Sequence, residues 1–190
     1  MIKIGILGDI GSGKTYVAKN FGYPVFHADD EVGKIYKKDR KVFNKLKKVL
    51  PNYIHSFPIN KNEIIKAILA NKQNLKKIIK IIHLEVRKKM IKFLKKNESK
   101  KIVILDVPLL LENKIDQKTD ILVFVQSKKK DILKKLKKRK NFSFELLSIF
   151  KDFQLSLAYK RKKSQFIIIN NFTSKSVKKS SINSILRKIL

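Results

Sequence analysis

Apolar, β-branched residues gather in five short runs along the chain, and the segments between the runs have helical spacing. The runs cover residues 2–7, 24–27, 102–107, 121–126 and 166–170. Several are apolar almost throughout, as strands covered on both faces must be. Because helical segments alternate with these runs, the pattern predicts an α/β fold: a five-stranded parallel sheet with helices on both faces.

A long helical region separates the second predicted strand from the third. In it, apolar residues recur three or four positions apart opposite a Lys-rich face: Leu75, Ile79, Ile82, Val86, Met90 and Phe93. A stripe of this kind indicates packing in a core. We expect residues 54–98, approximately, to form a helical insertion that receives a second substrate. The 190 residues suffice for one domain and are too few for two ordinary ones, so we expect a single domain over 1–190.

The second half of the chain predicts three more helices. Residues 128–140 form a very basic stretch, and the next predicted helix has one apolar face made of Leu146, Phe150, Phe153 and Leu157. The last stretch, 173–190, ends in an apolar helical pattern. We expect that final segment to pack as a terminal helix.

The first predicted strand leads directly into residues 8–15, which spell G-x-x-x-x-G-K-[ST], and a predicted helix follows. In this order the glycines let successive backbone N–H groups converge on a β-phosphate at the positive end of the helix. Lys14 would reach the β- and γ-phosphates, and the Thr15 hydroxyl would ligate Mg²⁺. Asp9 occupies an x position, so the motif is kept if its side chain points outward. The sequence therefore predicts binding of a nucleoside triphosphate.

The net charge of +31 has two explanations. The basic residues are 41 Lys and 5 Arg. The abundant Lys, Ile and Asn have A/T-rich codons, so a genome rich in A and T could account for much of the positive charge. A surface for nucleic acid is the other explanation. The lysines alternate with Ile and Leu at helical spacing, without an aromatic-studded basic stripe, and we expect no specific nucleic-acid partner.

Cysteine is absent, which excludes disulfides, and three scattered histidines argue against a zinc site. The first apolar run is six residues long and leaves no room for a signal peptide. No stretch reaches the roughly 18 apolar residues of a membrane span. We expect a soluble, cytoplasmic protein without a membrane partner, as a monomer or small homo-oligomer.

Acidic residues follow the second and third predicted strands, where ligands bind in open parallel sheets. Asp29, Asp30 and Glu31 come after the second strand, and one aspartate there could accept a proton from an attacking hydroxyl. Helix capping is the alternative role for these acids. Asp106 ends the third strand, like the carboxylate that holds Mg²⁺ directly or through water in phosphate-loop enzymes.

Arg139 is one of only five arginines. A retained arginine in a Lys-rich chain indicates a need for its planar, bidentate guanidinium. A mobile helix, at about 128–142, could carry it over the phosphates, neutralise charge in the transition state and exclude water. A surface arginine is the alternative.

Taken together, these residues resemble the dephospho-coenzyme A kinase family, from Ile2 to about Asn171. Residues 25–29 are similar to its D-A-D element, with His27 at the first aspartate and Asp29 at the second, the family's proposed catalytic base. Residues 108–112 match its P-L-L-x-E segment, the most specific signal after the loop.

Weaker elements of the same resemblance lie elsewhere in the chain. Residues 81–84 are similar to a helical I-I-H-P, and Lys135, Arg139 and Ser143 follow the R-x-x-x-R lid pattern with its first Arg changed to Lys. Gln154, Lys160 and 166–170 are similar to the closing Q, K and V-I-x-N elements. Lys61 stands where the family has the Arg of L-D-R, which keeps the charge and loses the bidentate geometry.

The resemblance implies ATP-dependent phosphorylation of the ribose 3′-hydroxyl of dephospho-coenzyme A, the last step of coenzyme A biosynthesis. It implies Asp29 as base, with Lys14, Arg139 and Mg²⁺ stabilising the transferring phosphoryl group. The implied ATP contacts are Gly8, Gly11, Ser12, Gly13, Lys14, Thr15, Tyr16, Arg139 and Asn170. The implied acceptor contacts are Asp29, Lys61, His83, Pro108, Leu109 and Glu112, and the implied Mg²⁺ ligands are Thr15 and Asp106.

Two other functions stay open at the level of sequence. Phosphate loop, lid and parallel sheet do not name the acceptor, so another small-molecule or nucleotide kinase is one alternative. The P-L-L-x-E segment and His83 argue against it. A basic nucleic-acid-binding protein that retains ATP is the second, and salt-dependent binding to DNA or RNA without acceptor phosphorylation would be its mark.

Overall fold

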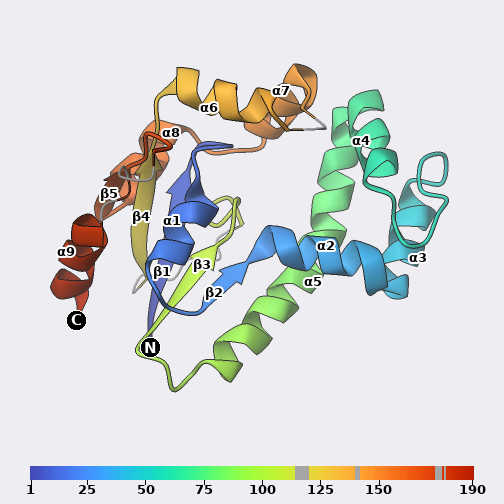
Figure 1. Cartoon of the computed structure of the whole chain (residues 1–190). Helices are drawn as coiled ribbons and strands as arrows, with labels where there is room; N and C mark the ends of the chain where they lie inside the picture. The colour runs from blue at the N-terminus through green and yellow to red at the C-terminus, as the bar shows by residue number, and fades with distance from the viewer. Residues whose placement is uncertain (114–119, 140–141, 174–176, 178) are drawn as a thin grey trace. The chain divides into compact units, whose positions relative to one another are not determined.

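A computed structural model describes residues 1–113, 120–139, 142–173, 177 and 179–190. The chain folds into two compact units (Figure 1). Unit 1 consists of Met1–His27, Asn97–Phe142 and Phe153–Leu190, and unit 2 consists of Ala28–Lys96 and Ser143–Asp152. The helical insertion expected at about 54–98 falls mostly in the first segment of unit 2, which also takes in the helices from Ala28 onward.

Unit 1 is built on a five-stranded parallel sheet. Its strands are β1 (Ile2–Gly8), β2 (Val25–His27), β3 (Ile102–Asp106), β4 (Ile121–Gln126) and β5 (Phe166–Ile169), in the order β2-β3-β1-β4-β5. The five predicted strands are confirmed to within one residue at each end. Because all strands run parallel, the segments that follow β1, β3 and β4 leave the sheet at the same edge.

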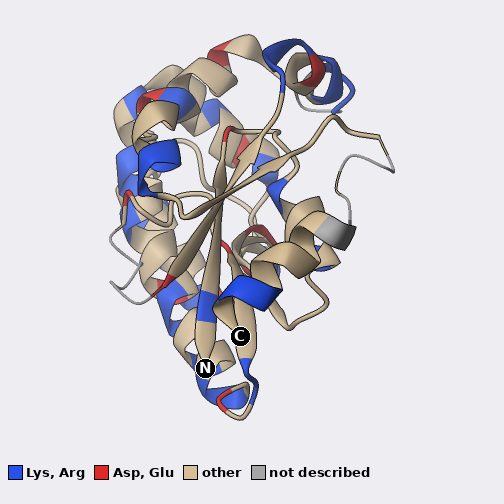
Figure 2. Ribbon diagram, turned by 90° about the vertical axis from the view of Figure 1, so that its left-hand side faces the viewer, with Lys and Arg blue, Asp and Glu red and all other residues tan. Residues whose placement is uncertain are grey.

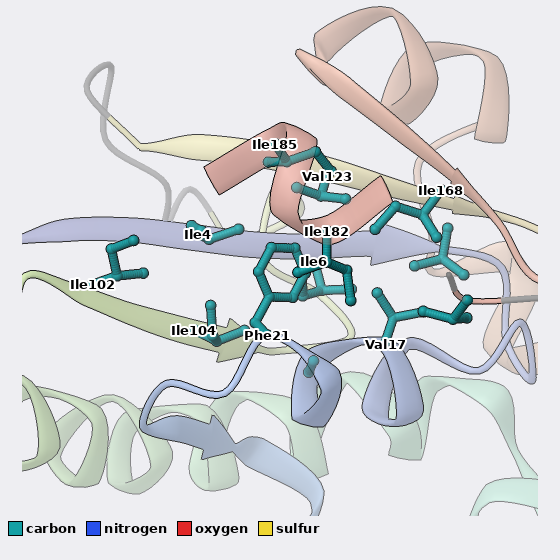
Figure 3. Packing of buried hydrophobic residues seen from close by; sticks show 13 residues of the cluster. Ile4, Ile6, Val17, Phe21, Ile102, Ile104, Val123, Ile168, Ile182 and Ile185 are labelled. Carbon is teal, nitrogen blue, oxygen red and sulfur yellow. The ribbon is translucent and has the colours of Figure 1, made fainter. Parts of the chain in front are cut away.

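The core of unit 1 lies on the sheet face that carries Ile4, Ile6 and Ile104. Figure 3 shows Val17 of one helix, Phe21 directly after that helix and Ile182 of another helix packed against these strand residues. The alternate strand residues point to the opposite face and are buried too: Leu7, Val103, Leu105, Leu122 and Phe124. This pattern explains why the strands are apolar almost throughout.

In the part of unit 1 that the structure describes there are four helices: α1 (Lys14–Asn20), α6 (Lys129–Lys137), α8 (Leu157–Lys163) and α9 (Lys179–Ile189). Helices α1 and α9 contribute to the core face, and α8 contacts β1 and β4. The predicted terminal helix is therefore confirmed as α9. In α6 the buried residues are Ile132 and Leu136, while the lysines stay at the surface.

The prediction of one helix carrying Leu146 through Leu157 is wrong. Helix α7 (Phe144–Asp152) ends before the stripe does, and α8 begins anew after Ser156. The Ser156 hydroxyl accepts a hydrogen bond from the Tyr159 N–H at 3.2 Å, which caps the new helix. The prediction failed because the apolar residues keep helical spacing across the break between the two helices, and spacing alone does not reveal the cap.

Unit 2 is helical in its described residues. It contains α2 (Ala28–Lys38), α3 (Arg40–Val49), α4 (Lys61–Ala70), α5 (Lys72–Lys96) and α7, and α5 packs against α2, α3 and α4. The predicted stripe on α5 is confirmed at Leu75, Ile82, Val86 and Met90 and needs two corrections: Ile78 is buried in place of Ile79, and Phe93 is only half-buried. Burial also raises the pKa of Tyr36 on α2 to about 12.

Lys and Arg residues are spread over the helices of both units, with few acidic residues among them (Figure 2). This distribution is what solvated helix faces produce. In the parts of the chain that the structure describes, no helix combines the length and the apolar character needed to cross a membrane.

Candidate functional site

The loop between β1 and α1 is shaped by two glycines that other residues could not replace. Gly11 has φ 82° and Gly13 has φ 89°, both in the region that L-residues rarely adopt. A Cβ on Gly11 would press against Leu136 and Ile132 of α6. One on Gly13 would collide with the side-chain amide of Asn170. Glycine is therefore required at both positions for two reasons: the backbone has a positive φ, and neighbouring side chains leave no space for a Cβ.

Two side chains fix the loop from the ends of neighbouring strands. The Ser12 carbonyl accepts hydrogen bonds from the Ser127 hydroxyl at 3.0 Å and from the Asn170 amide at 2.9 Å. Ser127 follows β4 and Asn170 follows β5. Asn170, a predicted ATP contact, is only 1% exposed, so its observed contacts are with the protein. The loop is therefore held in shape before any ligand binds.

The Lys14 ammonium group lies over the loop itself. Its Nζ donates to the Asp9 carbonyl at 2.9 Å and to the Gly8 carbonyl at 3.3 Å. We expected the Asp9 side chain to point outward, and this expectation is wrong. Asp9 is 9% exposed, and its carboxylate accepts a hydrogen bond from the Ile10 N–H at 2.7 Å. Asp9 therefore turns its charge back onto the loop backbone, and the motif is kept by a different arrangement.

Thr15 of α1 meets two residues that end neighbouring strands, His27 of β2 and Asp106 of β3. The Thr15 hydroxyl donates to Asp106 Oδ2 at 2.6 Å, and His27 Nδ1 lies 3.1 Å from the same oxygen. The register explains the second contact, because His27 of β2 is paired with Asp106 of β3. The Asp106 side chain is 8% exposed, and a buried carboxylate needs such partners.

The chemistry of this set suits a hard cation. A hydroxyl and a carboxylate oxygen are the donor types that Mg²⁺ prefers, whereas soft metals prefer thiolate and imidazole. Among the described residues, His, Cys, Asp and Glu form no cluster of three that could hold a metal by themselves. The residues that fit Mg²⁺ here are Thr15 and Asp106, which leaves room for phosphate oxygens and water to complete the shell.

Glu112, a predicted acceptor contact, lies in a buried ion pair. Its Oε1 is 2.7 Å from Lys160 Nζ and also accepts from the Leu155 N–H at 3.0 Å. Lys160 is 1% exposed and donates to Gln154 Oε1 at 3.1 Å. Charges buried this deeply need these partners, so the contacts tie the segment after β3 to α8 and the residues before it.

The structure also gives the exposure of the other predicted residues. In unit 1, Tyr16 is 46% exposed and Arg139 is exposed just after α6, while Pro108 and Leu109 are half-buried. The expected lid, 128–142, contains residues 140–141, which lie outside the described residues. In unit 2, Asp29 is in the first turn of α2 and Lys61 opens α4, both exposed, and His83 is half-buried on α5. Their roles stay predictions.

Sequence reasoning missed two residues beside the loop. Ser127 stabilises Ser12, and its signal was available, since it is a polar residue directly after a predicted strand. Phe172 lies close to Gly13, and its ring Cε1 is 3.5 Å from the position that a Cβ on Gly13 would take. No local pattern pointed to it.

A methyl group on Gly13 tests the close packing of the loop. We expect Gly13→Ala to weaken ATP binding at least about tenfold, because the methyl group disfavours the backbone angle and displaces the Asn170 amide from Ser12. Calorimetric titration with ATP and Mg²⁺ measures the affinity.

Gly33→Ala is the matched control for that substitution. Gly33 lies inside α2, and nothing is within 4 Å of its added Cβ. It should leave ATP affinity unchanged and raise stability by about 0.5–1 kcal/mol, the usual gain of alanine in a helix. Wild-type ATP affinity in Gly13→Ala would contradict the argument from packing.

A family model described as dephospho-CoA kinase matches residues 2–176 of this chain. Two proteins named dephospho-CoA kinase are similar over most of their length. The one from Wolbachia pipientis wMel is 35% identical over 170 residues, with 87% of each chain covered. The one from a Wolbachia of Brugia malayi is 31% identical over 188 residues, with 96% of this chain and 95% of the relative covered.

Solved structures share the fold. The crystal structure of TT1252 from Thermus thermophilus aligns with a TM-score of 0.78 and 23% identity, covering 100% of this chain and 98% of that one. A dephospho-CoA kinase from Campylobacter jejuni aligns with a TM-score of 0.61 and 19% identity, covering 98% and 96%. At these identities the likeness concerns the fold alone.

Proposed function

Because the chain belongs to the dephospho-CoA kinase family, we propose that it transfers the γ-phosphoryl group of ATP to the ribose 3′-hydroxyl of dephospho-coenzyme A, which gives coenzyme A and ADP. The observation that carries the proposal is the contact of Thr15 with Asp106 directly beside Lys14. A phosphate loop and a strand-end carboxylate joined in this way are the donor half of a phosphoryl-transfer site.

In the donor half, the loop N–H groups and Lys14 bind the β- and γ-phosphates. Lys14 would exchange the Asp9 and Gly8 carbonyls for phosphate oxygens, which are stronger partners because they are charged. Ser127 and Asn170 hold the Ser12 carbonyl and so keep the loop preorganised. Arg139 is proposed to neutralise charge on the transferring group from the segment after α6.

Thr15 and Asp106 are the residues proposed to hold Mg²⁺, which when bound supplies positive charge to the β- and γ-phosphate oxygens. His27 orients the Asp106 carboxylate through its Nδ1 contact. The family pattern has an aspartate at this position. A histidine at this position adds no second negative charge beside Asp106.

In the acceptor half, Asp29 is proposed to accept the proton of the 3′-hydroxyl. It follows His27 by two positions in the chain, just beyond the carboxyl end of β2, where ligands of parallel sheets bind. Lys61 and His83 are proposed acceptor contacts from α4 and α5, together with Pro108, Leu109 and Glu112 after β3. We also expect the protein to act in the cytoplasm, with ATP and dephospho-coenzyme A as its substrates.

A steady-state assay of coenzyme A formation tests the proposal. Purified protein with ATP, Mg²⁺ and dephospho-coenzyme A should give coenzyme A and ADP in equal amounts, and chelation of Mg²⁺ should abolish the product. Nucleoside monophosphates as acceptors provide the comparison. Product from a monophosphate but none from dephospho-coenzyme A would assign a different kinase activity to the same donor site.

A further inference from the structure

Phe172 adopts a backbone conformation that its side chain disfavours. Its φ is 60°, and no other non-glycine residue of the described part of the chain has a positive φ. The left-handed region costs an L-residue roughly 1–2 kcal/mol and is rare for bulky side chains. The Phe172 N–H donates to Asn170 Oδ1 at 3.0 Å, which holds this bend in place.

The bend brings the phenyl ring to the phosphate loop. Asn170 bonds Phe172 through its Oδ1 and the Ser12 carbonyl through its Nδ2, so one buried side chain fixes both. The ring is half-buried and lies beside Gly13, the last residue before α1. It is not part of the hydrophobic core cluster of unit 1.

A cation reaches the ring from α6. Lys135 Nζ lies 5.8 Å from the ring centroid, within the range of a cation–π contact. The Lys135 side chain is exposed, and its helix packs toward Gly11 through Ile132 and Leu136. The ring is therefore accessible to a polar group arriving from the α6 side of the loop.

Glycine would adopt this backbone conformation at a lower cost in free energy, so any benefit of phenylalanine comes from its ring. A nucleotide bound by its phosphates in the loop carries its base one ribose away from them. Aromatic side chains stack on nucleobases, and the interaction tolerates any base because each has a π-face. A ring next to Gly13 with an accessible face is suited to that contact.

We propose that Phe172 is the stacking partner of the donor's nucleobase, with the base taking the place of the Lys135 ammonium group against the ring. Lys135 then moves to the base or to the phosphates, as its flexible stem allows. The inference rests on the proposed function, since it takes a nucleoside triphosphate as the donor. It adds a residue that binds the base to the loop residues that bind the phosphates.

The test compares ATP with inorganic tripolyphosphate, which has the phosphates and lacks the base. Affinities for both are measured by calorimetry with Mg²⁺ for wild type, Phe172→Gly and Phe172→Tyr. Phe172→Gly should weaken ATP binding about tenfold, the loss expected for one stacked base, and leave tripolyphosphate binding unchanged. Phe172→Tyr should restore ATP affinity. The melting temperature of Phe172→Gly should not fall, because glycine suits φ 60°.

Tyr159→Ala is the matched control, because Tyr159 is an exposed aromatic residue of the same unit with Lys163 Nζ at 5.8 Å from its ring. It should leave both affinities unchanged. ATP affinity of Phe172→Gly within twofold of wild type would overturn the inference. Equal losses for ATP and tripolyphosphate would also overturn it, since the ring would then act on the loop. A wild-type protein that binds neither ligand would instead overturn the proposed donor function, on which the inference depends.

Discussion

Asp29→Asn is expected to lower kcat for coenzyme A formation by about a hundredfold to ten-thousandfold, the contribution typical of a general base. The amide keeps the size of the side chain and cannot take the proton of the attacking hydroxyl. ATP affinity should be unchanged, because the donor contacts lie in the loop and at Asp106. Steady-state kinetics with varied dephospho-coenzyme A, together with calorimetric titration of ATP, measure the two effects separately.

Asp30→Asn is the control for this substitution. Asp30 is the next residue, is also exposed and lies in the same first turn of α2, so both substitutions remove one negative charge from the helix N-terminus. Any loss from the helix dipole or from net charge should therefore be shared by the two variants. Near-normal turnover of Asp29→Asn, or an equal loss in Asp30→Asn, would remove Asp29 from the role of base.

Lys160→Met is expected to lower the free energy of unfolding by about 3–5 kcal/mol, because it leaves the buried Glu112 carboxylate without its cation. For a chain of this size the loss corresponds to a fall in melting temperature on the order of 10 °C. Chemical unfolding followed by circular dichroism measures the free energy.

Two further variants separate the ion pair from other effects of the substitution. Lys162→Met on the same helix removes an exposed charge and should change stability by less than about 0.5 kcal/mol. Adding Glu112→Gln to Lys160→Met should restore at least half of the loss, since the neutral amide can still accept from the Leu155 N–H. A double variant no more stable than Lys160→Met would show that the pair is not the cause.

The ion pair between Lys160 and Glu112 could not be predicted from the sequence. The P-L-L-x-E segment can be read from the sequence, and the family resemblance implies that Glu112 contacts the acceptor. Its partner is 48 positions away and is one of 41 lysines, nearly all of which the composition would place at the surface. Only the packing of α8 beside the segment after β3 selects this lysine for burial.

His27 and Asp106 are an intermediate case. The sequence placed both at carboxyl ends of strands, and parallel topology brings such ends to one edge. Their direct contact depends on β2 pairing with β3 in the register that sets His27 opposite Asp106. Strand order and register are set by long-range pairing, which no local pattern contains.

By itself, the sequence determined the five strands, the parallel α/β class, the phosphate loop and the family, because hydrophobic period and glycine positions act over a few residues. The tertiary structure decided what surrounds the loop: Asn170 and Ser127 on Ser12, α6 against Gly11, and Phe172 beside Gly13. These contacts join residues more than a hundred positions apart. They arise because neighbouring strands, distant in the sequence, end side by side at one edge of the sheet.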